Sequence, residues 1–566
     1  MSRAKLESST FDAIVVGSGI TGGWAAKELS ERGLNTLVIE RGRNVVHAQD
    51  YTTEHLPVYN FKFRLMGDKR RYAHDHAVQG TSSFFTEATE HFFVNDRLNP
   101  YTTDPDKPYH WLRGHQLGGR SLMWGRQSYR MAPRHFEENA RDGHGTDWPI
   151  RYEDLAPWYS HVEKFIGVSG EAIHHPMSPD GEFQPPFPMN SVELAFKERA
   201  AKAFKDRPVT MARTANLTQF LGNRAPCHYC QYCERGCSPG AYFSSLSSTL
   251  PAALATGRLK ITTDSIVHSV IYDAKTNRAA GVRVIDAKTH KTREYRAKIV
   301  VLCASTFESI RILLNSATAR YSSGLANSSG TLGKYILDHF PSDIALAEMD
   351  GPALPNFTGG RPVPLHIPRF RNLSEERSDY VRGYQLNGGA WPSGWERGLR
   401  MAGFGADFKK ELSTTGRWNM VWIAQCESLP RADNTVTLDP KVKDAWGVPA
   451  VRINYTYGDN DAAMRKEATT SVVEMFEATG TRDVHVIPIK PVPGESIHEM
   501  GGARMGRDPK TSVVNAYNQT HDIPNLLVTD GAAMASASSA NPSLTYMALT
   551  ARACAHAVDE MKRRNL

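Results

Sequence analysis

The pattern of apolar and polar positions near the N-terminus predicts a strand, a helix and a second strand in close succession. Residues 12–16 form an apolar run typical of a buried parallel strand. Ala25, Ala26 and Leu29 then follow helical spacing, and the run 36–39 predicts the second strand. This order is typical of a parallel α/β sheet.

A glycine motif joins the first strand to the helix. Gly17, Gly19 and Gly22 form G-x-G-x-x-G, and Glu40 ends the second strand eighteen residues after Gly22. Such glycines let the backbone approach a pyrophosphate, to which the helix N-terminus offers free N–H groups. Glu40 is placed to accept hydrogen bonds from the hydroxyls of an adenosine ribose. The unit predicts a dinucleotide site, without choosing between FAD and NAD, and a turn without ligand is the alternative.

Strand-like runs between residues 258 and 305 return the chain to the same sheet, and residues 50–110 resemble an extended surface segment. The runs are Leu259–Thr262, Ile266–Tyr272, Ala280–Ile285, Tyr295–Ala297 and Lys298–Ala304. Helices are expected over Tyr152–Val168, Asn190–Phe204, Ser305–Leu314 and Ser543–Lys562.

The segment 340–490 has a different pattern. Its β-like runs Met420–Cys426 and Asn434–Leu438 are separated by connections rich in Pro and Gly, which predicts an antiparallel sheet in a second lobe. The side chains Gln385, Asn387, Trp391 and Trp395 suit a sugar, although these Trp residues also suit an ordinary core.

Four of the seven cysteines lie within eleven residues. Cys227, Cys230, Cys233 and Cys237 follow C-x2-C-x2-C-x3-C, a spacing typical of an iron–sulfur site. Zinc and disulfides are the alternatives, but zinc ribbons usually separate two C-x2-C pairs by more than a dozen residues. The other three, Cys303, Cys426 and Cys554, are expected to be buried structural thiols.

The overall composition narrows the class of protein. The 566 residues require more than one core, and a net charge of +7 spread over this length does not indicate a nucleic-acid partner. Residues 1–10 lack the apolar region of a signal peptide or anchor, and no apolar run approaches a membrane span.

Two further stretches carry chemistry. Paired glycines in residues 117–121 suggest a backbone pressed against a flat ligand, although a glycine-rich turn explains them too. Near the C-terminus, Asp530 follows a strand and is expected near a phosphate or ribitol. His498 and Asn541 are the candidate reactive groups, although a single His is more often a structural hydrogen-bonding residue.

Together these motifs resemble the glucose–methanol–choline (GMC) oxidoreductase family from end to end, through the N-terminal unit, LGGRSLMWG, HEMGGARMG, VTDGAAM and SSANPSLT. The resemblance implies a Rossmann-type α/β FAD-binding lobe and an α+β substrate lobe with an antiparallel sheet, as in p-hydroxybenzoate hydroxylase. The FAD lobe is expected over 1–46, 100–130, 225–340 and 491–566, and the substrate lobe with its cap segments over 47–99, 131–224 and 341–490.

The resemblance also implies roles for individual residues. His498 and Asn541 match the catalytic pair, His498 as general base and Asn541 as donor to the substrate oxygen. Met123 replaces the histidine that some members link covalently to flavin, so non-covalent FAD is implied, and Trp124 replaces a common Asn. The expected FAD contacts are Gly17, Gly19, Gly22, Glu40, Gly118, Gly119, Ser121, Val267, Asp530 and Pro542.

The cysteine run resembles that of bacterial FAD-dependent sugar dehydrogenases, and CERGCSPGAYFSS is similar to glucoside 3-dehydrogenases. That branch carries a [3Fe-4S] cluster on C-x5-C-x3-C, which Cys227, Cys233 and Cys237 match, and Cys230 would permit [4Fe-4S]. It implies a small subunit with a twin-arginine signal, a cytochrome c or other electron acceptor, and periplasmic co-export, with a cytoplasmic location as the alternative.

The resulting hypothesis is oxidation of a secondary hydroxyl of a sugar or glycoside, at C3, by hydride transfer to flavin N5. Electrons would then leave through the cluster. The alternatives are a gluconate 2-dehydrogenase or fructose dehydrogenase type of subunit, a sugar oxidase that uses O2, and a subunit that only carries electrons.

Overall fold

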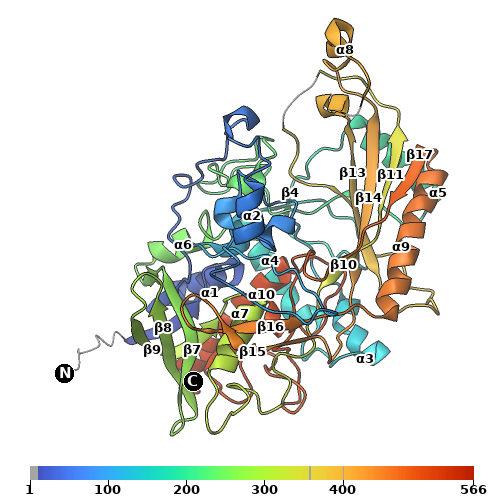
Figure 1. The fold of residues 1–566 in the computed structure, drawn as a ribbon. Coiled ribbons are helices and arrows are strands. Elements are labelled where there is room, and N and C mark those ends of the chain that lie inside the picture. The colour runs from blue at the N-terminus through green and yellow to red at the C-terminus, as the bar shows by residue number, and fades with distance from the viewer. Residues whose placement is uncertain (1–9, 356–358, 400) are drawn as a thin grey trace.

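The computed structural model describes residues 10–355, 359–399 and 401–566 (Figure 1). The expectation that the N-terminus carries neither signal peptide nor anchor falls largely on residues 1–9, outside the described residues. Within the described ranges, no helix combines the length and the apolar character that crossing a membrane requires.

The first of two large sheets contains the dinucleotide unit predicted from the sequence. Its path is β6 (Leu259–Thr262), β2 (Thr36–Ile39), β1 (Thr10–Val16), β9 (Thr292–Leu302), β8 (Arg278–Asp286) and β7 (Ser265–Asp273), with β18 (Leu526–Val528) also paired to β9. The central pairs are parallel, whereas β7, β8 and β9 form an antiparallel meander. Residues 292–302 are one long strand rather than the two expected, because β9 changes partners along its length, from β8 to β1 and β18.

Both faces of this sheet are covered, as the continuous apolar run of β1 predicts. Ala13 and Val15 pack in one cluster with α1 (Ile20–Glu31) and α10 (Ser543–Lys562). Ile14 and Val16 belong to a second cluster, which includes residues of α7 (Thr306–Asn315). Helices α4 (Tyr152–Ile166) and α6 (Thr249–Ala255) complete the layer beside α10 and α1.

The second sheet is antiparallel throughout. Its path is β17 (Arg482–Ile487), β11 (Ile344–Met349), β14 (Trp418–Glu427), β13 (Tyr384–Pro392), β12 (Leu365–Ile367) and β5 (Thr210–Met211), and β10 (His339–Pro341) pairs with β14. Buried side chains alternate along β14, and Met420 and Trp422 lie in the cluster that also holds residues of α9 (Asp459–Ala478) and α5 (Ser191–Ala203). Figure 1 shows these two helices outside the sheet, so the other face of the sheet is turned toward the rest of the molecule.

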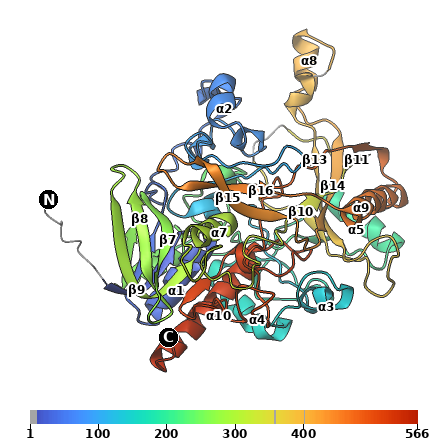
Figure 2. The ribbon, with the colours of Figure 1, turned by 60° about the horizontal axis from the view of Figure 1, so that its bottom comes forward.

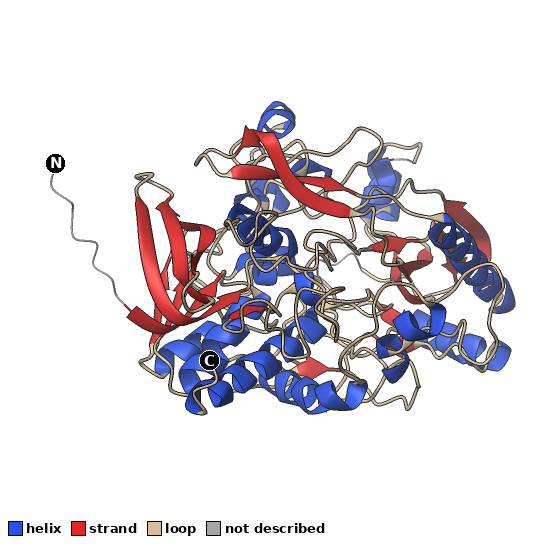
Figure 3. Ribbon diagram, turned by 90° about the horizontal axis from the view of Figure 1, so that it is seen from below, coloured by secondary structure: helices blue, strands red, loops and turns tan. Residues whose placement is uncertain are grey.

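A two-stranded ribbon lies between the large sheets and packs on α7 (Figure 2). It consists of β15 (Thr435–Lys443) and β16 (Pro449–Asn454), so the run Asn434–Leu438 does not join the second sheet as expected. The residues of β15 alternate correctly for a strand, but alternation does not specify the partner strand. Figure 3 shows the two main sheets set apart, with helices and loops between them.

The remaining elements are short. Residues 50–110 contain helix α2 and several single turns of 3-10 helix rather than an extended chain. The short elements are α2 (Lys69–Asp75), α3 (Glu138–Asp142), α8 (Gly405–Glu411), β3 (Val168–Ser169) and β4 (Phe183–Gln184). The architecture confirms the predicted two-lobed α/β fold.

Candidate active site

A cavity of about 420 Å³ lies between the two sheets and joins the two glycine motifs with the motifs near the C-terminus, whereas the cysteine run does not line it. One part is lined by the end of β1 and by Glu40 after β2, and another by Gln425 of β14. His498 and Asn541, from the C-terminal segment, also line it. The cavity is therefore long enough to connect the dinucleotide motif with the candidate reactive pair.

The three motif glycines have different surroundings. A Cβ atom on Gly22 would lie 2.0 Å from the carbonyl oxygen of Gly17, and one on Gly17 would lie 2.4 Å from that of Cys303. A Cβ on Gly19 would meet nothing within 4 Å, although Gly19 lines the cavity. Gly17 and Gly22 thus permit the tight turn, whereas Gly19 leaves space for a ligand beside the N-terminus of α1.

Glu40 is a buried carboxylate held at the end of β2. One of its oxygens accepts from the backbone N–H of Ser18, 3.1 Å away, and the other from that of Gly42, 2.8 Å away. Burial raises its pKa, and the hydrogen bonds from Ser18 and Gly42 oppose that change. The carboxylate lines the cavity, where ribose hydroxyls could donate to it.

The second glycine motif packs directly on the first. The N–H of Gly118 donates to Oγ of Ser18 across 2.9 Å, and a Cβ on Gly119 would lie 3.1 Å from Cα of Gly19. Ser121 accepts from the N–H of Ser245. Gly119 and Ser121 line the cavity, whereas the expected FAD contacts Gly118 and Gly22 are not among the residues that line it.

The third group of expected contacts also reaches the cavity, through Val267 on β7, Asp530 after β18 and Pro542 before α10. The side chain of Asp530 caps the following turn by accepting from the N–H of Ala532. Burial raises the pKa of Asp530 to about 6. The open glycine, the buried carboxylate and the helix N-termini fit the flavin dinucleotide that the resemblance implies.

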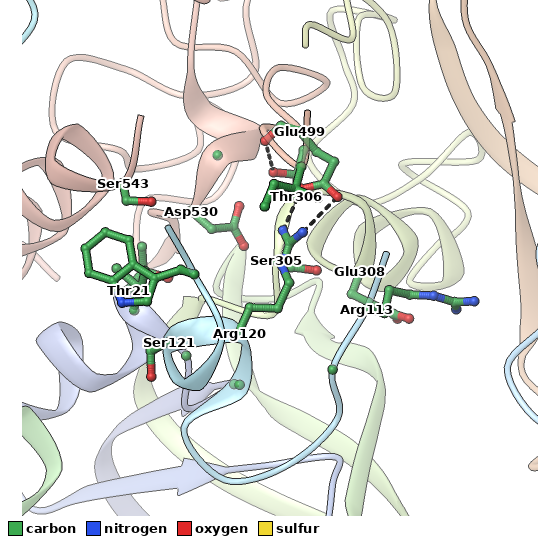
Figure 4. Close-up of a pocket in the computed structure, with 18 of the residues that line it drawn as sticks. Thr21, Arg113, Arg120, Ser121, Ser305, Thr306, Glu308, Glu499, Asp530 and Ser543 are labelled. Carbon is green, nitrogen blue, oxygen red and sulfur yellow. Dashed lines mark hydrogen bonds and ion pairs between the residues drawn. The ribbon is translucent and has the colours of Figure 1, made fainter. Parts of the chain in front are cut away.

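A buried ion pair crosses the cavity wall. Figure 4 shows Arg120 reaching toward Glu499, and their atoms approach to 3.0 Å and 2.5 Å in a bidentate pair. Thr306, at the start of α7, donates to the carbonyl oxygen of Glu499. This contact fixes the residue that follows His498 in the chain.

His498 and Asn541, the candidate reactive groups, meet in the cavity. Nδ2 of Asn541 lies 3.4 Å from Nε2 of His498. Burial lowers the pKa of His498 well below its usual value, and His339 and Arg120 act in the same direction. The imidazole is therefore neutral at ordinary pH and able to accept a proton.

Three side chains lie beside the pair: His339 and Gln425, which the sequence analysis did not assign a role, and Gln385, which was expected to bind a sugar and instead contacts Asn541. Nδ1 of His339 lies 2.8 Å from Nδ1 of His498, and Nε2 of Gln385 lies 2.9 Å from Oδ1 of Asn541. Gln425 donates to the carbonyl of Ser539 and lines the cavity. They come from β10, β13 and β14, and only the register of the second sheet brings them to the pair.

The proposed sugar platform is corrected in part. Trp391 and Trp395 are exposed by 52% and 62%, and neither they nor Asn387 line the cavity. These two rings lie at the end of β13 and in the 3-10 helix Trp395–Leu399 that follows it, rather than in the core or the site. Cys303, Cys426 and Cys554 are buried, as expected.

The four clustered cysteines do not form the expected metal site. Among the described residues, no group of three or more His, Cys, Asp or Glu side chains is arranged to hold a metal ion. Cys227 and Cys230 are fixed by backbone contacts with Leu217 and Gly360. Burial raises the pKa of Cys233 to about 12 and that of Cys237 to about 11, so these thiols are protonated in this arrangement. The donor set has the right chemistry for iron, but its geometry here is not that of a cluster site.

Two buried arginines nevertheless lie near this loop. The charge of Arg126 interacts most strongly with Cys233, and Arg126 also pairs with Glu234. The charge of Arg224 interacts with Cys237, and Arg224 has no carboxylate partner among the ion pairs of the described residues. Nε of Arg126 and Nη2 of Arg224 are buried without a hydrogen-bond partner. These two guanidinium groups would favour a negative charge on the thiols, against the larger effect of burial.

Comparison with known families gives two matches. Residues 201–340 and residues 430–550 each match a family model described as GMC oxidoreductase.

Curated relatives match over nearly the whole chain or over about half of it. A 2-methyl-1,2-propanediol dehydrogenase of Mycolicibacterium austroafricanum is 29% identical, covering 96% of this chain and 94% of its own length. The fructose dehydrogenase large subunit of Gluconobacter japonicus is 28% identical over 98% and 99%. A C-glycoside 3-oxidase of Microbacterium trichothecenolyticum is 26% identical over 53% of each chain.

Solved structures show the same fold at low sequence identity. A formate oxidase superposes with a TM-score of 0.63 at 15% identity, covering 99% of this chain and 100% of its own. Pyridoxine 4-oxidase from Mesorbium loti gives 0.61 at 17% identity, over 96% and 98%.

Proposed function

We propose that this chain, in which residues 201–340 and 430–550 match models of the GMC oxidoreductase family, is an FAD-dependent enzyme of that family that oxidises a secondary hydroxyl of a sugar or glycoside, at C3. The observation that carries the proposal is the contact between Nε2 of His498 and Nδ2 of Asn541 inside the cavity. An imidazole lone pair beside an amide donor suits a hydroxyl that must lose a proton while its oxygen stays fixed.

In the proposed reaction, His498 and Asn541 have different roles. Neutral His498 accepts the hydroxyl proton at Nε2. Asn541 donates from Nδ2 to the same oxygen and stabilises the negative charge that develops on it. FAD, when bound, supplies the acceptor for the hydride. The glycines of the first motif and Glu40 bind the dinucleotide, and Gln127 and Gln425 offer amides to further hydroxyls in the cavity.

The choice of substrate rests on the amide-rich wall and on the relatives. Their names point to a diol, a free sugar and a glycoside, so the three classes are to be compared directly. We propose the glycoside because the sequence around the cysteines resembles glucoside 3-dehydrogenases, and because the neutral amides of Gln127, Gln425 and Asn541 line the cavity.

The test is an anaerobic titration of the purified holoprotein with methyl glucoside, with fructose and 2-methyl-1,2-propanediol as comparisons. The proposal expects bleaching of the flavin absorbance by methyl glucoside and a 3-keto product. Bleaching by fructose or the diol alone would refute the glycoside assignment and leave the class of enzyme intact.

A finer proposal concerns how electrons leave. We propose that the cysteine loop holds an iron–sulfur cluster and that this chain is exported with a small subunit and reduces a cytochrome or similar acceptor. The spacing of the thiols and the two buried arginines support it, and the thiol geometry described above does not. Iron and acid-labile sulfide at three or four atoms per chain are expected, together with little peroxide per sugar oxidised. Absence of iron with stoichiometric peroxide would favour the sugar oxidase instead.

A further inference from the structure

The hydrogen bonds around His339 determine which nitrogen of His498 carries a proton. Nε2 of His339 lies 2.7 Å from the carbonyl oxygen of Ser538, and a carbonyl only accepts. Nε2 of His339 therefore carries its hydrogen. Burial lowers the pKa of His339 to about 4, so the ring is neutral and its Nδ1 is a lone pair.

His498 must then be the donor in the contact between the two rings. Its Nδ1 lies 2.8 Å from Nδ1 of His339 and donates the hydrogen. A neutral imidazole carries one such hydrogen, so Nε2 of His498 is left with its lone pair. This nitrogen faces Asn541 and the cavity.

A second chain of contacts orients the amide of Asn541. A lone pair on His498 Nε2 requires the amide nitrogen of Asn541, rather than its oxygen, to face it. The amide oxygen then accepts from Nε2 of Gln385 across 2.9 Å, and Oε1 of Gln385 lies 3.2 Å from Nε2 of His366. His366 is buried and stacked on Tyr129 at 4.3 Å between ring centroids. Every donor in the series has one acceptor, from His366 to the carbonyl of Ser538.

We propose that His339 and Gln385 are positioning residues. His339 fixes the tautomer of His498 that has a lone pair on Nε2 of His498. Gln385 fixes the amide of Asn541 so that Nδ2 faces the substrate. The proposal rests on the proposed function in so far as His498 and Asn541 are the catalytic pair. It assigns the orientation of that pair to side chains of the second sheet, on β10 and β13.

The tautomer can be measured without any turnover. In the FAD-loaded protein labelled with 15N-histidine, the ring nitrogens of His498 are assigned from the signals lost in His498→Ala. The wild type is expected to show the Nδ1–H tautomer. His339→Leu is expected to show a mixture of tautomers, and His339→Asn, whose Oδ1 takes the place of the ring Nδ1, is expected to restore the wild-type form. An Nε2–H tautomer in the wild type, or no change in His339→Leu, would overturn the proposal.

Kinetics distinguish positioning from structural support. The rate of flavin bleaching by methyl glucoside is expected to fall by about 10²-fold in His339→Leu, the lower end of what a general base contributes, with KM unchanged within about twofold. His339→Asn is expected to recover most of the rate, whereas His339→Gln, which keeps only the donor to Ser538, is expected to stay slow. Equal rates in the Asn and Gln variants would contradict the assignment.

His135→Asn provides a matched control for stability. His135 is also a buried histidine with hydrogen bonds on both sides, to Ala132 and Ser539, but it does not contact His498. The free energy of unfolding of His135→Asn shows how much stability is lost when a buried histidine ring is removed. If the wild type does not respond to any sugar, the proposed function fails, and the tautomer measurement still decides the present inference.

Gln385 is tested with two variants of similar size. In Gln385→Met the donor to Asn541 is lost, whereas in Gln385→Glu a carboxylate can only accept and turns the amide of Asn541 around. Bleaching is expected to be slower in Gln385→Glu than in Gln385→Met. The rate in Gln385→Glu is expected to fall by up to about 10²-fold relative to the wild type. A purely structural role predicts no such order, and a Glu variant as fast as the Met variant would refute the role of Gln385.

Discussion

Asn541 directs its amide nitrogen toward Nε2 of His498 across 3.4 Å, although 43 residues separate them in the chain. The contact joins the loop before α10 to the segment that follows β17. It places a donor and a proton acceptor within reach of one oxygen atom, and the four predictions below concern the groups that build or support this arrangement.

Replacing His498 by Ala is expected to slow flavin bleaching by methyl glucoside by at least about 10²-fold, because the proton acceptor is lost. FAD content is expected to be unchanged, since His498 is not among the residues that hold the dinucleotide motif. Stopped-flow absorbance under anaerobic conditions measures the rate. A rate close to that of the wild type would show that another group takes the proton.

Two glycines of one motif are expected to respond differently to Ala. Gly19→Ala should leave the melting temperature of the FAD-free protein unchanged, because a Cβ there meets nothing within 4 Å. The methyl group enters the space meant for the cofactor, so Kd for FAD should rise by about tenfold, or ~1.4 kcal/mol. Gly22→Ala should lower the melting temperature itself, because its Cβ would lie 2.0 Å from a carbonyl oxygen.

Flavin fluorescence titration and thermal unfolding measure the two effects. Gly33→Ala is a control for backbone strain alone, because Gly33 has a positive φ of 99° and an open surrounding outside the cavity. Loss of FAD binding in Gly33→Ala equal to that in Gly19→Ala would show that the cavity is not the cofactor site.

The N-terminal unit and the C-terminal helix were predicted almost to the residue. The reason is that Gly17, Gly22 and the apolar runs around them report local requirements, which a sequence displays directly. The role of His339 was missed because a histidine beside Asp and Phe has no local pattern of its own. Only the register of β10 against β14 determines what its ring contacts.

The assignments that depended on distant partners were the ones that needed correction. The run that became β15 alternates as a strand should, but nothing in it selects β16 rather than the second sheet as partner. The cysteine spacing reports which ligands are available, whereas the convergence of the thiols depends on contacts of the loop with Leu217 and Gly360.

Acid is expected to destabilise the protein through its buried histidines. Burial lowers the pKa of His135, of His339 to about 4 and of His366 to about 3, so below about pH 6.5 the unfolded chain binds more protons than the folded one. The free energy of unfolding therefore falls as the pH is lowered from 6.5 toward 4. Asp338 and Asp530 act in the opposite direction, because burial raises their pKa values to about 7 and about 6 and favours their neutral forms in the fold.

Denaturant unfolding at pH 7 and pH 5 measures the difference. His339→Asn should show a smaller loss of stability between the two pH values than the wild type, because one buried titrating ring has been removed. An identical pH dependence in this variant would show that His339 does not contribute.

Glu499→Gln is expected to destabilise the fold by about 3 kcal/mol, because it leaves the guanidinium of Arg120 without its partner in a mostly buried position. Glu495→Gln is the control, since Glu495 pairs with the ring of His110 near the surface and such pairs contribute about 0–1 kcal/mol. Chemical denaturation of both variants measures the effect. Equal stability of the two would mean that water screens the Arg120 pair.

The proposed catalytic pair belongs to the C-terminal segment, yet the two side chains proposed to orient it, His339 and Gln385, lie on strands of the other large sheet. The rate of turnover is therefore expected to depend closely on how the two large sheets are positioned relative to each other. A shift of about one ångström between the two sheets would separate the rings of His339 and His498 before either hydrophobic core unfolds. Warming, crowding or a partner that binds between the two sheets would thus change the rate of turnover before it changes the stability of the fold.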